Sequence, residues 1–189
     1  EFDVVIANPL SWVRWKGYEK DITNDKTGRF KYLPSISDGQ LLFMQHLISK
    51  LDSTGMGVVV HNGSTLFSGD AGSPESNIRK WMLDCDIVEA VIQLPTDEFF
   101  NTDIYTYLWV INKSKQEDHK GKVMLIDASG KFQPLKKSKG DKRNEIISLT
   151  DTVFVGTENI DAQIIQDELN PLNVFPNPFE QAISFSFYA

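Results

Sequence analysis

Asn8-Pro9 directly follows a short run of β-branched apolar residues, Val4-Val5-Ile6. The amino group of a nucleobase is a weak nucleophile, because its lone pair is delocalised into the ring. A carboxamide oxygen and a backbone carbonyl can accept its two hydrogens and favour a pyramidal nitrogen. Asn followed by Pro supplies both acceptors, since proline fixes the backbone direction. The pair therefore suits amino-group chemistry on a base, although Asn-Pro is also a common turn that ends a strand.

Aromatic side chains near such a pair can hold the base, because a flipped base stacks on an aromatic ring. Trp12 and Trp15 lie in the polar segment after Asn8-Pro9, and Phe99-Phe100 follow a later apolar run. Trp12, close behind Asn8-Pro9, is therefore a stacking candidate. Each of these rings also suits simple packing.

The elements that must position these residues follow from apolar spacing. Strands are predicted at 2–7, 58–60, 87–94, 105–111 and 121–126. A helix separates 2–7 from 58–60 and 58–60 from 87–94, whereas only a loop joins 87–94 to 105–111. One helix is predicted from a start at 37–40, with Asp38 as N-cap, to a stop at 54–57, and a second spans 75–83. Buried strands joined by helices predict an α/β fold with a mostly parallel sheet. The short connection before 105–111 predicts that this strand runs antiparallel.

The carboxyl ends of parallel strands meet at one edge of a sheet, where ligands bind in open α/β folds. Asn8-Pro9, His61-Asn62-Gly63 and the segment 95–103 follow predicted strands and are expected to converge there. His61 is open to two interpretations, a substrate contact or a buried structural histidine.

Composition excludes several classes of protein. The 189 residues contain one cysteine and three histidines, which excludes an internal disulfide and disfavours a zinc site. No run reaches the ~20 apolar residues of a membrane helix, so a cytoplasmic protein is expected. The net charge of −7 is unevenly spread: residues 1–112 carry −6, residues 113–143 carry +6 and residues 144–189 carry −7. The basic segment suits contact with phosphate, or is a solvated lysine-rich loop.

Several segments, in order over residues 1–146, carry a family resemblance. They are Asp3-Val4-Val5-Ile6-Ala7-Asn8-Pro9, Trp15-Lys16, Ser37-Asp38-Gly39-Gln40-Leu41-Leu42-Phe43, His61-Asn62-Gly63-Ser64-Thr65-Leu66-Phe67, Gly69-Asp70-Ala71-Gly72, Glu75-Ser76-Asn77-Ile78-Arg79, Glu89-Ala90-Val91-Ile92-Gln93-Leu94-Pro95, Phe99-Phe100-Asn101-Thr102 and Lys137-Ser138-Lys139-Gly140-Asp141-Lys142-Arg143-Asn144-Glu145-Ile146. Together they resemble the modification (methyltransferase) subunit of type I restriction–modification systems.

The resemblance implies an N6-adenine DNA methyltransferase that uses S-adenosylmethionine and acts on double-stranded DNA with a specificity subunit and a restriction subunit. It implies a Rossmann-like, doubly wound sheet, of which this chain is a part. It places Asn8 and Pro9 on the adenine amino group, with Asn8 also bordering the cofactor, and requires no metal. It places Phe99 or Phe100 beside the target base, and Trp15 in a loop that faces DNA or packs within the protein. It makes phosphate contacts plausible for the basic residues Lys136, Lys137, Lys139, Lys142 and Arg143.

Two departures from the family matter. Its catalytic tetrapeptide is Asn-Pro-Pro followed by Tyr or Phe, whereas this chain has Asn8-Pro9-Leu10-Ser11. Its glycine-rich cofactor loop is expected to lie before Glu1, so the chain is expected to be the C-terminal half of the catalytic domain and inactive alone. The alternative function is a degenerate, non-catalytic module for DNA binding or subunit interaction.

The expected organisation is a catalytic half-domain over 1–128, a basic family segment over 129–146 and a divergent acidic tail over 147–189. Phe175-Pro176-Asn177-Pro178-Phe179 and the alternating apolar residues after it suggest an extra strand in that tail.

Overall fold

The computed structural model describes residues 1–100, 104–146 and 154–158. Asn101, Thr102 and the Pro-rich segment 175–179 fall outside these ranges. The described elements, in chain order, are β1 (Phe2–Ala7), η1 (Lys16–Tyr18), α1 (Glu19–Thr23), α2 (Gln40–Lys50), β2 (Leu51–Asn62), α3 (Ser64–Phe67), α4 (Pro74–Asp84), β3 (Val88–Gln93), β4 (Thr106–Asn112), η2 (Glu117–His119), β5 (Lys122–Asp127), β6 (Phe132–Lys139), β7 (Lys142–Ile146) and β8 (Phe154–Glu158).

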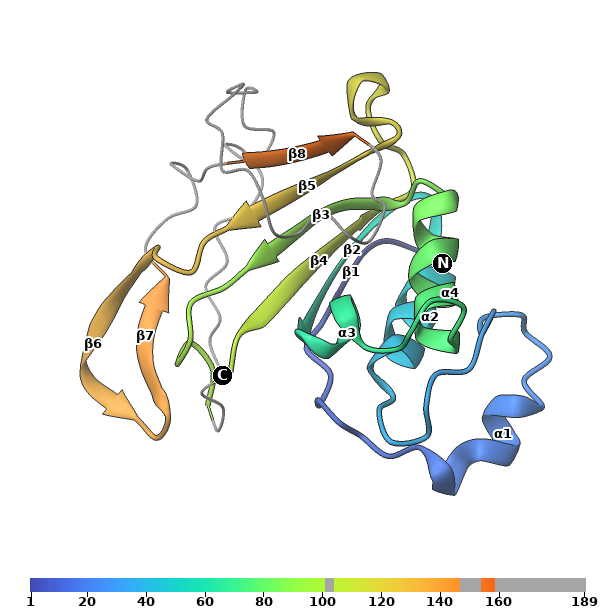
Figure 1. The fold of residues 1–189 in the computed structure, drawn as a ribbon, viewed down its shortest axis with the longest axis horizontal. Helices are drawn as coiled ribbons and strands as arrows, with labels where there is room; N and C mark the ends of the chain where they lie inside the picture. Colours follow the sequence, from blue (N-terminus) through green and yellow to red (C-terminus); the bar gives the residue numbers. More distant parts are fainter. Residues whose placement is uncertain (101–103, 147–153, 159–189) are drawn as a thin grey trace.

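The main sheet has six strands in the order β1-β2-β4-β3-β5-β8, and β6 and β7 form a separate hairpin (Figure 1). β1 pairs with β2, and β3 with β5, in parallel, whereas β4 is antiparallel to both β2 and β3. The α/β fold with a mostly parallel sheet and an antiparallel β4 is confirmed. β8 adds a second antiparallel strand beside β5, inside the segment expected to be a divergent tail.

The core lies between the sheet and the helices α2 and α4, which cover the same face in Figure 1. Met44 of α2 and Ile78 and Met82 of α4 are fully buried there against Val59 and Ile111 of the sheet. A second cluster, centred on Val110, lies on the opposite face. Burial of these side chains is the main force that holds the helices on the sheet.

β1 differs from the buried strand that its sequence predicts. It is an edge strand, and the side chains of Phe2, Val4 and Ile6 are 59%, 62% and 53% exposed on one face. Val5 and Ala7, on the other face, pack against the core beneath the helices. The apolar run at 2–7 therefore predicts a strand correctly. It does not predict how buried the strand is, because burial depends on which other elements pack against it.

The junction between α2 and β2 also differs from the prediction. The helix ends at Lys50 and the strand begins immediately at Leu51, whereas the sequence suggested a stop at 54–57 and a strand at 58–60. The pairing of β2 with β1 is irregular between Phe2 and Val4, so residues 52–55 are accommodated in an extended but irregular strand. The Gly/Ser-rich segment after β2 contains α3, a short helix that was expected to be loop.

No helix among the described residues is long and apolar enough to cross a membrane.

Candidate functional site

β1, β2 and β3 run in the same direction, so their carboxyl ends share one edge of the sheet. Asn8-Pro9, Gly63 and Pro95 follow those ends, which confirms the predicted convergence. β1 and β3 are separated by β2 and β4, which places them about 14 Å apart at ~4.8 Å per strand. Asn8 and the segment after β3 therefore lie at the same end of the sheet but on strands that are not neighbours.

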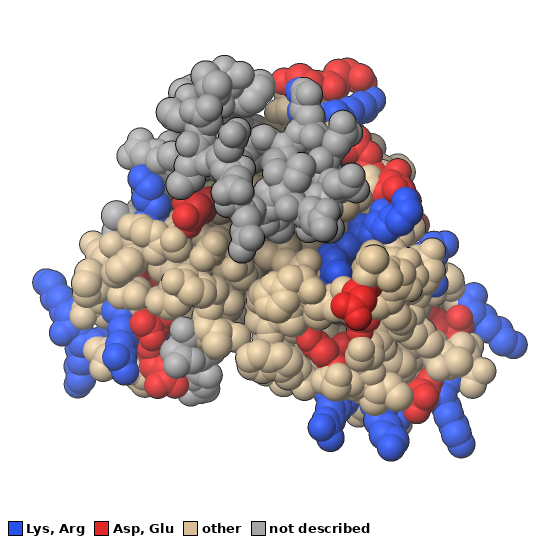
Figure 2. Space-filling model, in the orientation of Figure 1, with Lys and Arg blue, Asp and Glu red and all other residues tan. Residues whose placement is uncertain are grey.

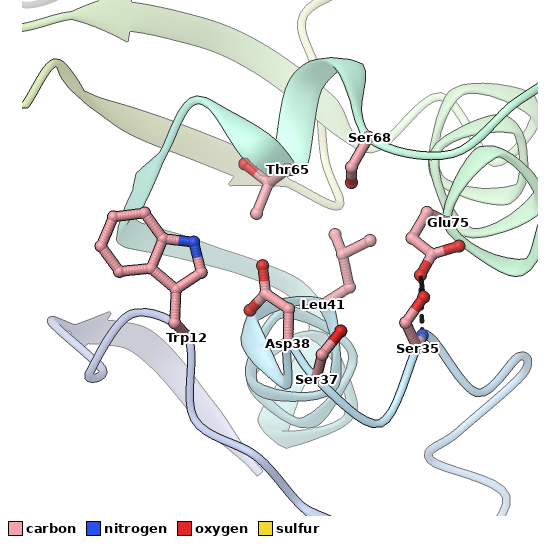
Figure 3. A pocket seen from close by; sticks show the side chains of 8 residues that line it. All are labelled: Trp12, Ser35, Ser37, Asp38, Leu41, Thr65, Ser68 and Glu75. Atoms are coloured by element: carbon pink, nitrogen blue, oxygen red, sulfur yellow. Dashed lines mark hydrogen bonds between the residues drawn. The ribbon is translucent and has the colours of Figure 1, made fainter.

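A pocket of about 260 Å³ opens at this edge, beside the segment that follows β1. It is lined by Trp12, Ser35, Ser37, Asp38, Leu41, Thr65, Ser68 and Glu75. Figure 3 shows the Trp12 ring on one side, Asp38 in the middle and Glu75 on the far side. An aromatic ring, four hydroxyls and two carboxylates suit a planar ligand that carries hydrogen-bond donors.

Asp38 belongs to a polar network that joins the start of α2 to the end of β2. Its carboxylate accepts hydrogen bonds from the Gln40 backbone N–H (3.1 Å) and the Ser64 hydroxyl (2.9 Å). The Gln40 side chain donates to Asn62 Oδ1 (3.1 Å) and accepts from the Asn62 backbone N–H (3.0 Å). Asp38 is not the predicted N-cap, since that position is Gly39. Two segments that carried the family resemblance therefore contact each other through these residues.

Glu75 fixes the far wall of the pocket. Its side chain is 8% exposed and accepts hydrogen bonds from the Ser35 backbone N–H (2.7 Å) and the Ser35 hydroxyl. Burial raises the pKa of Glu75, but the hydrogen bonds from Ser35 outweigh it and hold that pKa below the usual carboxyl value. Glu75 is thus an anion at neutral pH and ties the long loop after β1 to the start of α4.

Ser35, Gln40 and Glu75 were not predicted as site residues, although Gln40 and Glu75 stand in segments that carry the family resemblance. Gln40 carried a usable signal, because a glutamine at the first turn of an amphipathic helix, next to apolar Leu41, lies where burial is expected. Ser35 and Glu75 are 40 residues apart, and no local pattern predicts their contact.

Trp12 and Trp15 have different environments. Trp12 is 57% exposed, lines the pocket and has a φ of 53°, in the left-handed region that non-glycine residues rarely adopt. Trp15 is 5% exposed and donates from its indole N–H to the Ser35 carbonyl (3.0 Å). Trp15 therefore packs inside the loop rather than facing a ligand, whereas Trp12 is placed to meet one.

Phe99 and Phe100 also separate. Phe99 is partly buried and packs against the second core cluster, whereas Phe100 is 50% exposed. Of the two rings, Phe100 is available to a base at the surface. Asn8 is exposed as well, directly after β1.

His61 is buried at the end of β2. It is 1% exposed, and neither ring nitrogen has a hydrogen-bond partner among the described residues. Burial lowers its pKa from 6.5 to about 4, and the nearby Asp38 charge opposes this only in part. His61 is therefore neutral at pH 7, as the structural interpretation expects.

We expect His61 to make the protein acid-sensitive. Its folded pKa lies below its unfolded pKa, so unfolding takes up a proton, and stability present above pH 6.5 is lost as the pH falls toward 4. Between pH 7 and pH 5 this group should cost about 2 kcal/mol of the free energy of unfolding. Urea unfolding of His61→Leu and the unaltered chain across this range measures the difference. Equal pH dependence of the two proteins would show that His61 is not the cause.

The β6–β7 hairpin carries the predicted basic residues and projects from the sheet (Figure 1). Figure 2 shows blue side chains gathered at its end of the molecule. Lys136, Lys137, Lys139 and Arg143 are exposed. Lys142 differs, because its ammonium group donates to the Glu98 carbonyl (2.8 Å) and pairs with the Glu98 carboxylate (3.0 Å). It is engaged within the protein rather than free for phosphate.

The described residues hold no group of three or more His, Cys, Asp or Glu side chains placed to bind a metal ion. Nor, within the same ranges, is any strand followed by a loop with the Gly-x-Gly spacing that commonly binds a nucleotide-like cofactor. Asn8 is the predicted cofactor-bordering residue that the structure places at the sheet edge.

The chain is similar to DNA methylases in both sequence and structure. The family model described as N-6 DNA Methylase matches residues 1–169, which extends beyond Ile146, where the recognisable motifs end. The methylase subunit of type I restriction enzyme MpnII from Mycoplasma pneumoniae is 33% identical over 141 residues, covering 72% of this chain and 25% of that protein. The MjaVII methylase subunit from Methanocaldococcus jannaschii is 31% identical over 172 residues, covering 85% and 26%.

Among solved structures, the methyltransferase subunit of a type I restriction–modification system from Streptococcus thermophilus superposes with a TM-score of 0.62. It is 28% identical, and the match covers 77% of this chain and 29% of that one. The chain thus spans about a quarter of the length of the curated relatives it matches. With a family model over most of its length and a matching sheet, the chain belongs to the N-6 DNA methylase family.

Proposed function

We propose that this chain forms the target-amino-group part of a type I modification subunit, an N6-adenine DNA methyltransferase that uses S-adenosylmethionine. One observation carries the proposal: in a chain of this family, Asn8 is exposed directly after β1, and the segment that follows it lines a pocket with the aromatic ring of Trp12. The relatives with this similarity are named as type I methylase subunits.

In this proposal, Asn8 Oδ1 and the adjoining backbone carbonyl accept the two hydrogens of the adenine N6 amino group. Acceptance of both hydrogens directs the nitrogen lone pair away from the ring. S-adenosylmethionine supplies the methyl group from its sulfonium. The methylated nitrogen carries a positive charge, which Asn8 stabilises until one proton passes to solvent water, and the donor sulfonium would leave as a neutral thioether.

Trp12 replaces the aromatic residue that the family carries directly after its Asn-Pro-Pro sequence. It is exposed, lines the pocket and has the strained backbone that is typical of functional positions. A ring in this place stacks the flipped base and is worth about 1–3 kcal/mol per base. The altered Leu10-Ser11 pair therefore leaves the site with a stacking residue.

The nucleoside end of the cofactor is held, in this proposal, by polypeptide outside this chain. The described strands lack a glycine-rich loop, and β1 presents an exposed apolar face at the edge of the sheet. The specificity and restriction subunits of a type I system are the proposed partners, and double-stranded DNA is the substrate.

The test is transfer of labelled methyl groups from S-adenosylmethionine to DNA, by the longer protein that carries this chain together with its specificity subunit. Digestion of the product should yield N6-methyladenine. Labelled cytosine, or no labelled base, would contradict the proposal. Calorimetry of this chain alone should detect no S-adenosylmethionine binding, and micromolar affinity would show that the cofactor site is complete without further polypeptide.

The exposed hairpin residues should contribute to DNA affinity by neutralising phosphates. Replacing Lys136, Lys137, Lys139 and Arg143 with Gln should flatten the plot of log K against log salt by about 0.9 for each phosphate that the protein no longer neutralises. Fluorescence anisotropy with a labelled duplex at several salt concentrations measures this slope. An unchanged slope would assign the hairpin to another role.

A further inference from the structure

The β6–β7 hairpin is attached to the loop that follows β3. The backbone N–H groups of Arg143 and Asn144 both donate to the Asp97 carbonyl, at 2.9 and 3.1 Å. The Asn144 side chain donates to the Thr96 carbonyl (2.9 Å). The second strand of the hairpin therefore holds consecutive peptide groups of a loop that lies more than 40 residues earlier in the chain.

Lys142 extends this attachment by one residue. Its ammonium group donates to the Glu98 backbone carbonyl (2.8 Å) and to the Glu98 carboxylate (3.0 Å). Both side chains are largely buried, with 18% of Lys142 and 13% of Glu98 exposed. A shielded, charge-assisted contact is stronger and more directional than a surface pair.

β7 has two distinct faces. Lys142, Asn144 and Ile146 are partly buried, whereas Arg143 and Glu145 are exposed. Ile146 packs against the same core cluster as Phe99. One face of β7 thus contacts the loop and the core, and the other carries charge toward solvent.

The loop held in this way leads directly to Phe100. Asp97 has a φ of 58°, a left-handed conformation that a non-glycine residue keeps only where its surroundings impose it. Its carbonyl is the group that accepts from both Arg143 and Asn144. Phe99 turns into the core, and Phe100 is left exposed at the same sheet edge as Asn8.

We propose that Lys142 and Asn144 are positioning residues, which clamp residues 96–98 so that the Phe100 ring is presented to the flipped adenine. The inference rests on the proposed function. According to this inference, Lys142 does not contact phosphate, and the two faces of the hairpin have different roles. The exposed face contacts the DNA backbone, and the inward face sets the position of a ring that contacts the base.

A clamp of this kind acts on the chemical step rather than on overall DNA affinity. Phosphate contacts on the exposed face keep the duplex bound, while a displaced ring leaves the base poorly oriented. A displacement of about 1 Å can lower the rate a hundredfold. A lysine that contacts phosphate behaves differently, because its removal weakens binding and lowers the salt dependence.

The experiment uses the longer protein with its specificity subunit and compares Lys142→Met, Asn144→Ala and Phe100→Leu. Lys131→Met, just before β6, is the control, since it removes one positive charge from the same segment without touching the loop. We expect Lys142→Met and Asn144→Ala to lower kcat about ten- to hundredfold, with the KM for DNA within about twofold of the unaltered protein. Lys131→Met should leave kcat unchanged.

A second readout reports on the base itself. With 2-aminopurine in place of the target adenine, Lys142→Met should change the fluorescence of the bound duplex in the same direction as Phe100→Leu. The combined Lys142→Met/Phe100→Leu variant should lose less activity than the product of the two single losses, because both act through one ring.

The outcomes are distinct. Equal kcat for Lys142→Met, Asn144→Ala and Lys131→Met, in a protein that methylates adenine, would overturn the clamp and leave the proposed function standing. A rise in KM with an unchanged kcat would assign Lys142 to phosphate and also overturn it. If the unaltered protein transfers no methyl group to adenine, the proposed function falls, and this inference falls with it.

Discussion

Asn8→Ala in the proposed N6-adenine methyltransferase should lower kcat by about a hundred- to a thousandfold, which is the usual loss when one preorganised partner of a developing charge is removed. The substituted side chain lies exposed directly after β1, so its removal leaves no cavity. The amino group would keep its hydrogens in the plane of the ring, and its lone pair would stay delocalised. Initial rates of labelled methyl transfer at saturating DNA and S-adenosylmethionine measure the loss.

Controls separate this effect from folding and binding. Asn24→Ala makes the same change at another exposed position that does not line the pocket, and it should keep full activity. Asn8→Asp retains an acceptor oxygen in the same place and should keep more activity than Asn8→Ala. DNA affinity should stay unchanged in all three variants, because the exposed hairpin residues supply it. If Asn8→Ala methylates adenine at the normal rate, Asn8 does not contact the reacting amino group.

Local pattern was enough to predict most of the elements around this site. The spacing of apolar residues located α2 and α4 and the strands β3, β4 and β5, and the short connection before Thr106 predicted that β4 runs antiparallel. The positions of these elements and the direction of β4 depend on periodicity and on connection length, which are both properties of residues close together in the sequence. The β-branched apolar run before Asn8-Pro9 likewise predicted that this pair follows the end of a strand.

What the sequence could not provide depends on partners distant in the chain. The exposure of Val4 follows from the edge position of β1, and the engagement of Lys142 follows from Glu98, 44 residues earlier. Composition alone treats Lys142 like the exposed lysines beside it. The same holds for Trp15, whose indole N–H donates to the Ser35 carbonyl in the tertiary structure.

Gly57 lies where β2 passes under α2, and we expect its replacement by a larger residue to destabilise the protein. A Cβ atom at this position would lie 2.4 Å from Leu47 Cδ2 and 3.2 Å from Leu51 Cδ1. Leu47 and Leu51 are 3% and 1% exposed, so the core gives these side chains little room to move aside. Gly57→Val should therefore lower the free energy of unfolding by about 1–3 kcal/mol or more through overpacking. Gly130→Val, where a Cβ meets nothing within 4 Å, is the matched control.

A double-mutant cycle tests the cause of the Gly57 effect. Leu47→Ala alone removes a buried side chain and should cost about 2–5 kcal/mol. In the Gly57→Val/Leu47→Ala protein, the valine enters the space that the leucine vacates, so the combined loss should be smaller than the sum of the two. Urea unfolding monitored by tryptophan fluorescence gives all three values. Strict additivity would show that contact with Leu47 is not the cause of the loss, and a neutral Gly57→Val would show that the helix can move away from the sheet without cost.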